Sequence, residues 1–151
     1  MCLQRNPIDA RHMKTRHYSV QIRTSSQAAR LLRDHFDDLD HEELWGIYLT
    51  GSGFLINAEM LTRGTLNCTP IDACTVIKRA LMNNAAAVII VHNHPSGNPR
   101  PSVNDITQTD HIRKACNLMD IALVDHLILT RDAYFSFNDE ATKNYQPIKN
   151  Q

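Results

Sequence analysis

Two histidines and an aspartate occur close together in this chain, in a pattern that is typical of a metal site. The apolar, β-branched run from Val88 to Val91 predicts a buried strand. His92 and His94 follow it two residues apart, so both side chains project from one face as the strand ends. With Asp105 they supply two neutral imidazoles and one carboxylate, which leave a fourth position for water. Such a ligand set predicts a catalytic zinc site, whose function is to activate water.

The segment between the histidines and Asp105 consists of residues that form turns. They are Pro95, Ser96, Gly97, Asn98, Pro99 and Pro101. These residue types disfavour regular structure. Ser102 then stands three residues ahead of Asp105, a spacing that predicts a helix start. Asp105 therefore has two interpretations: it completes a capping box, or it turns back toward the histidines as the third metal ligand.

Helices and strands before and after this segment of the sequence must position these residues. The hydrophobic pattern predicts where those helices and strands lie. Apolar residues at helical spacing predict helices over 25–36, from Thr69-Pro70 onward, and from 105 to about 119. Alternation and short apolar runs predict strands over 18–23, 44–50, 54–62, 88–91, 121–129 and 133–137. The order of these elements predicts an α/β fold with a mixed β-sheet flanked by helices.

Apolar spacing also predicts which face each of the last two helices buries. For the helix that opens at Thr69-Pro70, the predicted buried residues are Ile71, Cys74, Ile77 or Lys78, and Leu81. For the helix that follows Asp105, they are Ile106, Ile112, Ala115 and Leu118 or Met119. Both helices are expected to pack these stripes against the sheet.

A single domain over residues 18–137 accounts for this pattern. The chain has 151 residues, of which 42% are hydrophobic, and this is enough to bury a core. Residues 1–17 carry four basic side chains without apolar periodicity, which predicts a flexible basic arm. Residues 138–151 are polar and predict a loose C-terminal tail.

Composition excludes several classes of protein. Sixteen basic residues balance sixteen acidic ones, so the chain has no overall attraction to nucleic acid or to an anionic membrane. The longest apolar run, 85–91, is far too short to span a membrane, and the N-terminus lacks the apolar core of a signal peptide. The four cysteines show no Cys-x-x-Cys spacing, which indicates reduced thiols. We therefore expect a cytoplasmic protein that does not enter the membrane.

Four short motifs together resemble the RadC-like branch of the JAMM (MPN/JAB) metalloprotease superfamily. They are His92-Asn-His94-Pro-Ser-Gly, Pro101-Ser102-x-x-Asp105, Gly64-Thr65-Leu66 and Leu123-Val-Asp125-His126. The resemblance covers roughly residues 18–137. It implies a three-layer α/β fold of the cytidine-deaminase-like kind and a zinc ion held by His92, His94 and Asp105. We expect a short form that lacks the helix-hairpin-helix region of longer RadC proteins, and we do not infer a role in DNA repair.

The resemblance also implies roles for residues beyond the metal ligands. The family places a general-base glutamate on an earlier strand, and Glu59 is the candidate for that role here. Ser102 is implied to hydrogen-bond the charge that develops on the substrate carbonyl, although it can equally serve as a helix cap. Asp125 and His126 match a family signature. Because neighbouring residues on a strand face opposite ways, we interpret them as a structural pair.

Zinc-assisted hydrolysis of a peptide or isopeptide bond is the function that these features favour. Zinc lowers the pKa of bound water to about 7, and Glu59 is expected to shuttle the proton to the leaving amine. The alternative is a catalytically weak or inactive module of the same fold that binds DNA or a protein partner, with the basic arm on phosphates. An HNH nuclease is disfavoured, because in that motif the three residues lie on separate parts of a ββα unit.

Overall fold

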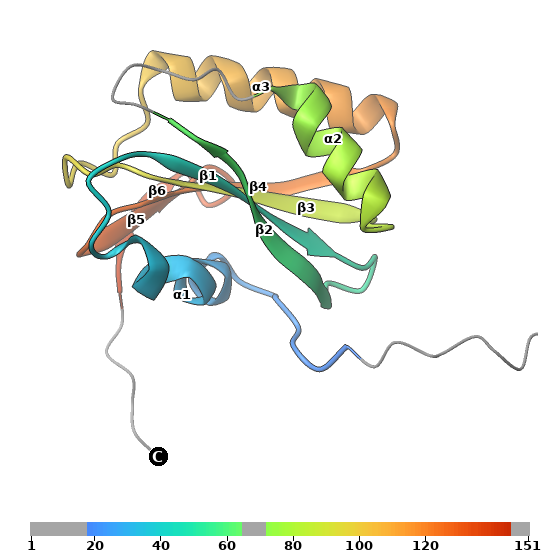
Figure 1. Ribbon diagram of the computed structural model, residues 1–151, viewed down its shortest axis with the longest axis horizontal. Helices are drawn as coiled ribbons and strands as arrows, with labels where there is room; N and C mark the ends of the chain where they lie inside the picture. Colours follow the sequence, from blue (N-terminus) through green and yellow to red (C-terminus); the bar gives the residue numbers. More distant parts are fainter. Residues whose placement is uncertain (1–17, 65–71, 146–151) are drawn as a thin grey trace, which may run out of the picture.

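The computed structural model describes residues 18–64 and 72–145. This part of the chain forms one sheet with helices on both faces (Figure 1). In chain order the elements are α1 (Ser25–Phe36), β1 (Glu43–Leu49), β2 (Leu55–Arg63), α2 (Ala73–Met82), β3 (Ala87–Asn93), α3 (Val103–Leu118), β4 (Ala122–Leu129), β5 (Ala133–Ser136) and β6 (Ala141–Asn144). The predicted basic arm and the first residues of the helix predicted from Thr69-Pro70 onward lie outside the described residues.

The sheet is mixed, as predicted, with its strands in the order β2-β1-β3-β4-β5-β6. β3 and β4 are parallel, and every other neighbouring pair is antiparallel. α1 covers one face of the sheet, while α2 and α3 cover the other (Figure 1). This arrangement confirms the predicted three-layer α/β fold. β3 lies centrally and is buried along its whole length, which is what its continuous apolar run requires.

Each face of the sheet packs its own apolar core, and β3 contributes to both. Alternate residues of a strand point to opposite faces. Ile89 and Val91 accordingly join the core beside α1, whereas Val88 and Ile90 join the core beside α2 and α3. His92 continues the alternation of Val88 and Ile90. The strand therefore delivers His92 to the face that α2 and α3 cover.

Capping residues set where the helices begin. Thr24 caps α1 and forms a capping box with Gln27, so α1 spans the predicted residues 25–36. Asp72 caps α2 by accepting hydrogen bonds from two backbone amides of its first turn. Ser102 and Asp105 form the predicted capping box at the start of α3. The start of α3 thus places Asp105 one turn inside the helix.

The buried faces of α2 and α3 differ from those predicted from apolar spacing. α2 buries the small residues Ala73, Val76 and Ala80, while Cys74 and Leu81 are exposed. The residues that α3 buries are Asp105, Thr109, Ile112 and Cys116. Ile106, Leu118 and Met119 are exposed. The prediction was right for Ile112, which is buried, and Ile77 and Ala115 pack against the core while partly buried. It was wrong for the exposed residues, because α2 buries small residues instead and two of the residues that α3 buries are polar. Ile71 lies outside the described residues.

The sheet differs from the prediction at its periphery. The strand predicted over 18–23 is reduced to a single bridge between Gln21 and Phe54. At the other end, β6 pairs with β5 beyond the predicted domain boundary at residue 137. β6 is an edge strand whose residues are all partly or fully exposed, so it lacks the apolar alternation by which a strand is found in a sequence.

Two expectations from composition bear on the described residues. Across 18–64 and 72–145, no helix has both the length and the apolar character needed to cross a membrane. The two cysteines in these ranges, Cys74 and Cys116, are free thiols. A cytoplasmic location stays a prediction from the sequence.

Candidate metal centre

The end of β3 brings the two predicted histidines together. His92 lies in β3, and His94 follows the strand directly, where its backbone amide donates to the Leu129 carbonyl at 2.9 Å. The Nε2 atoms of the two imidazoles lie 3.0 Å apart. After His94 the chain turns at Gly97, whose φ of +81° favours glycine. The chain then continues to Ser102, which caps α3.

Asp105, in the first turn of α3, completes the cluster. Its Oδ1 atom lies 3.3 Å from Nε2 of His92, and its Oδ2 atom lies 3.6 Å from Nε2 of His94. The same carboxylate accepts hydrogen bonds from the backbone amide of Ser102 at 2.7 Å and from its hydroxyl at 2.6 Å. Both interpretations of Asp105 therefore agree with the geometry, because one carboxylate completes the capping box and faces both histidines.

The spacing of the three side chains fits a zinc-sized cation. One ligand atom from each of His92, His94 and Asp105 can be chosen so that all lie within 4.8 Å of one another. Two nitrogen ligands about 2.0 to 2.1 Å from a tetrahedral zinc ion lie about 3.3 Å apart. The two Nε2 atoms here lie 3.0 Å apart, and each has a different Asp105 oxygen near it, at 3.3 and 3.6 Å. The three side chains of the His92-His94-Asp105 triad thus converge closely enough to hold a metal ion, while the identity of that ion stays a prediction.

Each histidine is oriented by its second ring nitrogen. Nδ1 of His94 donates to the Asn98 carbonyl at 2.8 Å. Because a carbonyl oxygen can only accept, the proton of a neutral His94 sits on Nδ1 and Nε2 presents a lone pair. Nδ1 of His92 lies 2.7 Å from Nε2 of His126. Partners of this kind hold metal-binding imidazoles in place.

The electrostatics of the triad favour a cation among its three side chains. Burial acts to raise the pKa of Asp105, but its close contacts with His92 and His94 and the hydrogen bond from Ser102 outweigh burial and hold that pKa far below its usual range. Burial acts to lower the pKa of His94, but its contacts with Asp105 and the Asn98 carbonyl raise that pKa above its usual value. An ionised carboxylate therefore faces two imidazoles, and a positive charge among them is favoured.

A cavity of about 220 Å³ opens beside the triad. Its other lining residues are Glu42, Glu43, Leu44, Thr62, Gly64, Ser102, Asn104 and Gln108. Glu59 is not among them. Its carboxylate accepts a hydrogen bond from the Asn83 amide at 3.0 Å and lies 3.6 Å from Arg79. The structure thus brings together four of the five predicted site residues, His92, His94, Ser102 and Asp105, and places Glu59 against α2 instead.

One family of proteins matches most of this chain. The match is to the RadC-like JAB domain, over residues 22–143. The chain belongs to that family. The matched range contains the triad and all residues that line the cavity. The family assignment confirms the resemblance that the sequence motifs indicated.

Relatives of this RadC-like JAB domain occur in distant bacteria. A UPF0758 protein of Porphyromonas gingivalis is 42% identical over 120 residues, which are 79% of this chain and 53% of the relative. UPF0758 proteins of Flavobacterium johnsoniae and Aquifex aeolicus are each 37% identical, over 80% of this chain and 52% of the relative. The chain spans about half the length of the curated relatives it matches, so their full-length activities do not transfer to it.

At the start of β1, the RadC-like JAB domain presents two adjacent glutamates to opposite faces of the sheet. Leu44 is the direct partner of His92 in the neighbouring strand. Glu42 stands two residues before Leu44, so strand alternation places it on the triad's face, where it lines the cavity. Glu43 points the other way. Its buried carboxylate contacts His35, His41, Trp45 and Arg63. Glu42, the residue just before β1, is therefore the carboxylate that faces the triad across the cavity.

Asn93, between the two histidines, ties β1 to the triad. Its buried side chain accepts a hydrogen bond from the backbone amide of Glu43 and donates to the carbonyl of His41, each at 2.8 Å. These two bonds lie on either side of Glu42 and fix its backbone beside β3. Sequence reasoning missed both residues. Glu42 is part of an acidic run that resembles a solvated loop, and the available signal was its position two residues before Leu44 in a predicted strand.

The contacts of Glu43 predict a pH-dependent contribution to stability. Burial acts to raise the pKa of Glu43, but hydrogen bonds from Trp45, His35 and His41 outweigh it and lower the pKa from its ordinary 4.5 to about 2. A lowered pKa stabilises the fold above the unfolded-state value, and that stability is lost as the pH falls toward the folded-state value. We expect the stability difference between the wild type and Glu43→Gln to shrink by about 2 kcal/mol between pH 6 and pH 3. Urea unfolding at each pH measures it, and a constant difference would contradict the assignment.

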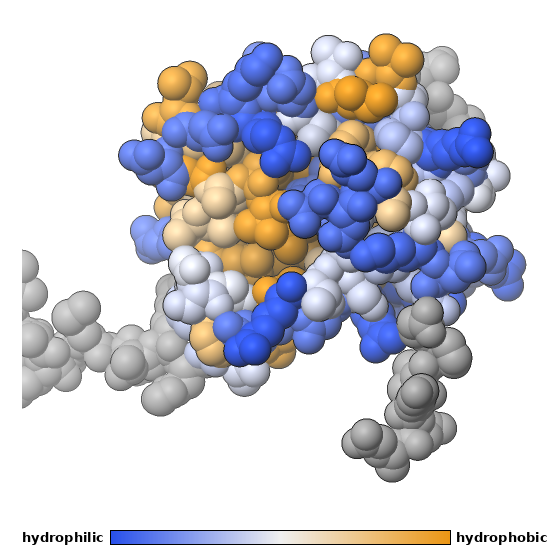
Figure 2. Space-filling view, turned by 180° about the vertical axis from the view of Figure 1, so that it is seen from behind, coloured by the Kyte–Doolittle hydropathy of each residue, from blue (hydrophilic) through white to orange (hydrophobic). Residues whose placement is uncertain are grey.

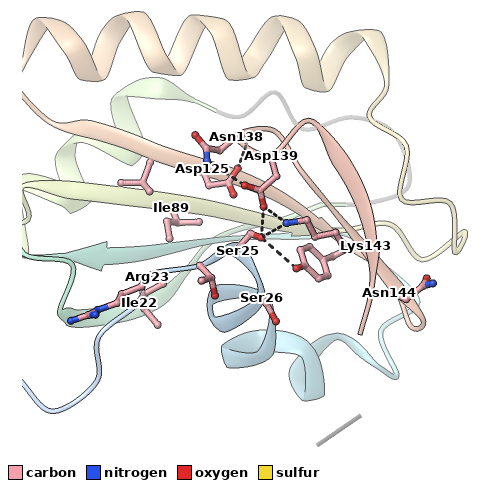
Figure 3. Close-up of a pocket in the computed structure, with 13 residues that line it drawn as sticks. Ile22, Arg23, Ser25, Ser26, Ile89, Asp125, Asn138, Asp139, Lys143 and Asn144 are labelled. Atoms are coloured by element: carbon pink, nitrogen blue, oxygen red, sulfur yellow. Dashed lines mark hydrogen bonds and ion pairs between the residues drawn. The ribbon is translucent and has the colours of Figure 1, made fainter. Parts of the chain in front are cut away.

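The signature pair Asp125 and His126 is divided between the two faces of β4, as strand alternation predicts. His126 is fully buried beside His92, and burial lowers its pKa well below the usual value. Asp125 points into a second cavity of about 640 Å³ on the α1 face (Figure 3). Burial raises the pKa of Asp125, although Ser136 and Asn138 donate hydrogen bonds to its carboxylate.

Seen from behind, the molecule shows an apolar area bordered by hydrophilic residues (Figure 2).

Proposed function

We propose that this RadC-like JAB domain is a metal-dependent hydrolase that cleaves a peptide or isopeptide bond. The observation that carries the proposal is the convergence of His92, His94 and Asp105 on one point in the wall of a cavity. Two imidazoles and one carboxylate leave a coordination position open, which is typical of hydrolytic rather than structural zinc sites. Zinc is the metal that we expect this donor set to hold.

The metal and the protein supply different parts of the chemistry. When bound, zinc supplies Lewis acidity, which makes water reactive near pH 7 and polarises a carbonyl. The protein must supply a group that takes a proton from the attacking water and returns it to the leaving amine. We infer that Glu42 is this group, because it lines the same cavity as the triad and sits on the same face of the sheet. Glu59 is on the same face but contacts Arg79 and Asn83 and does not line the cavity.

We propose that the Ser102 hydroxyl donates a hydrogen bond to the substrate carbonyl. It is exposed, lines the cavity and lies 2.6 Å from the Asp105 carboxylate. That hydroxyl donates its single proton to Asp105 in the structure. Turned toward a substrate instead, it can stabilise the negative charge that develops on the carbonyl oxygen, an effect typically worth about 3 kcal/mol. The same hydroxyl caps α3, so this role adds to its structural one.

The position of β2 supports an extended peptide as the substrate. β2 is an edge strand, and Thr62 and Gly64 at its end line the cavity. The free edge of a strand carries unpaired backbone groups that can pair with an added strand. A peptide that pairs with β2 is thereby led toward the triad. The formal net charge of the chain is zero, which offers no comparable support for nucleic acid as the substrate.

Zinc content and cleavage, measured together, test the proposed function. We expect the purified protein to hold about one zinc ion and to cleave members of a peptide and isopeptide-linked library. Removal of the metal with a chelator should abolish cleavage, and added zinc should restore it. His92→Ala serves as the metal-free control. A protein that binds no zinc in native mass spectrometry would refute the proposal, and one that binds zinc but cleaves nothing would favour the alternative of an inactive binding module.

A further inference from the structure

We propose that Thr109 and His126 are positioning residues that select the metal-binding tautomer of His92. The inference rests on the metal site of the proposed function and does not depend on hydrolysis. It concerns a buried chain of hydrogen bonds that runs from the backbone of Asp105 to the side chain of His92. This series of hydrogen bonds therefore begins at Asp105 and ends at His92, which are both residues of the triad.

Three contacts make up this hydrogen-bond chain. The hydroxyl of Thr109 lies 2.5 Å from the Asp105 carbonyl, one turn earlier in α3. The same hydroxyl lies 2.6 Å from Nδ1 of His126 in β4. Nε2 of His126 lies 2.7 Å from Nδ1 of His92 in β3. Thr109 and His126 are buried, with 3% and 0% of their surface exposed, so water does not compete for these groups.

The direction of every hydrogen bond follows from the carbonyl at one end. A carbonyl oxygen can only accept, so the single hydroxyl proton of Thr109 points at Asp105. The Thr109 oxygen must then accept its second bond, which places a proton on Nδ1 of His126. His126 is fully buried, and among the described residues its two ring nitrogens hydrogen-bond Thr109 and His92, neither of which carries a negative charge. Burial without a carboxylate partner favours the neutral imidazole, so Nε2 carries a lone pair. That lone pair requires a donor, which is Nδ1 of His92.

The consequence is that Nε2 of His92 has no proton. This is the nitrogen that faces His94 and Asp105, at 3.0 and 3.3 Å. A neutral histidine with the other tautomer would carry a proton at the place where the metal binds, and that proton would have to move before binding. His126 also stacks on Phe137, with ring centroids 4.7 Å apart and planes inclined by 5°, which holds its ring in register with His92.

The tautomers can be measured directly in the metal-free protein. Nitrogen-15 labelling of the histidines distinguishes a protonated Nδ1 from a protonated Nε2 by NMR. We expect His92 and His126 in the wild type both to carry their proton on Nδ1. This measurement requires neither zinc nor a substrate, so it decides the inference even if the proposed hydrolysis fails. A wild-type His92 that carries its proton on Nε2 would overturn the inference.

Two variants of Thr109 test the consequence for metal binding. Thr109→Val keeps the shape of the side chain but removes the hydroxyl, so His126 loses the acceptor that selects its tautomer. We expect the population of His92 with a protonated Nε2 to rise and the zinc dissociation constant to increase about 10- to 100-fold. Thr109→Ser keeps the hydroxyl and should bind zinc within about threefold of the wild type. A folded Thr109→Val protein with wild-type tautomers and wild-type zinc affinity would also overturn the inference.

Discussion

Glu42→Gln should leave zinc bound and lower turnover about 10²- to 10⁴-fold. The exchange keeps the size of the side chain but removes its ability to accept a proton from the attacking water. Glu42 lines the cavity but is not one of the three proposed ligands, so the metal content should not change. Zinc is measured by elemental analysis, and turnover is measured on a peptide that the wild type cleaves. The loss should appear mainly in kcat, because proton transfer belongs to the chemical step.

Glu59→Gln is the matched control for this prediction. It makes the same chemical change on the neighbouring strand β2, where the carboxylate contacts Arg79 and Asn83. We expect turnover within about threefold of the wild type and a stability loss below about 1 kcal/mol, as for an exposed ion pair. If Glu59→Gln removed turnover while Glu42→Gln retained it, the assignment of the proton carrier would return to Glu59.

The convergence of His92, His94 and Asp105 was predictable from the sequence because short-range geometry decides it. His92 and His94 are two residues apart at a strand end, so they share a face in any fold that contains the strand. Ser102 and Asp105 lie at the spacing of a capping box, and the turn residues before them fix a reversal of the chain. The α/β class followed in the same way from the order of strongly periodic segments.

Residues that depend on packing between distant elements were harder to predict. Glu42 and Glu59 lie on the same face of the sheet, so the choice between them depends on their positions along the strands. Glu59 pairs with Gly46, whereas the partner of His92 is Leu44. Apolar alternation is weak in β2, where no residue is fully buried, so this register was not predictable. Thr109 escaped notice because a search for apolar stripes passes over polar residues. Asp105, Thr109, Ile112 and Cys116 nevertheless follow the spacing of one helix face. Once Asp105 is taken as buried, that spacing identifies Thr109 as its neighbour.

Asp105→Ala should remove the stabilisation that zinc gives to the fold. At a free zinc concentration one hundred times the dissociation constant, metal binding stabilises the wild type by about 2.7 kcal/mol. For a chain of this length that is a rise in melting temperature on the order of 8 °C. Without zinc, loss of the Asp105 contacts in the capping box should cost only about 1 kcal/mol. Thermal unfolding of each protein, with chelator and with zinc, separates the two effects.

Two further variants separate the cap from the ligand, which one carboxylate combines here. Ser102→Ala removes the hydroxyl that accepts from the Asp105 amide at 3.1 Å, but it leaves the carboxylate in place. It should lose about 1 kcal/mol with and without zinc and keep the zinc-dependent rise. Asp105→Asn keeps an oxygen that can accept from Ser102 but lacks the charge of a metal ligand, so it should unfold near the wild type in chelator and lose most of the rise in zinc. An undiminished rise in both Asp105 variants would return Asp105 to the role of a cap alone, because a third ligand cannot be removed without weakening the hold of His92 and His94 on the metal.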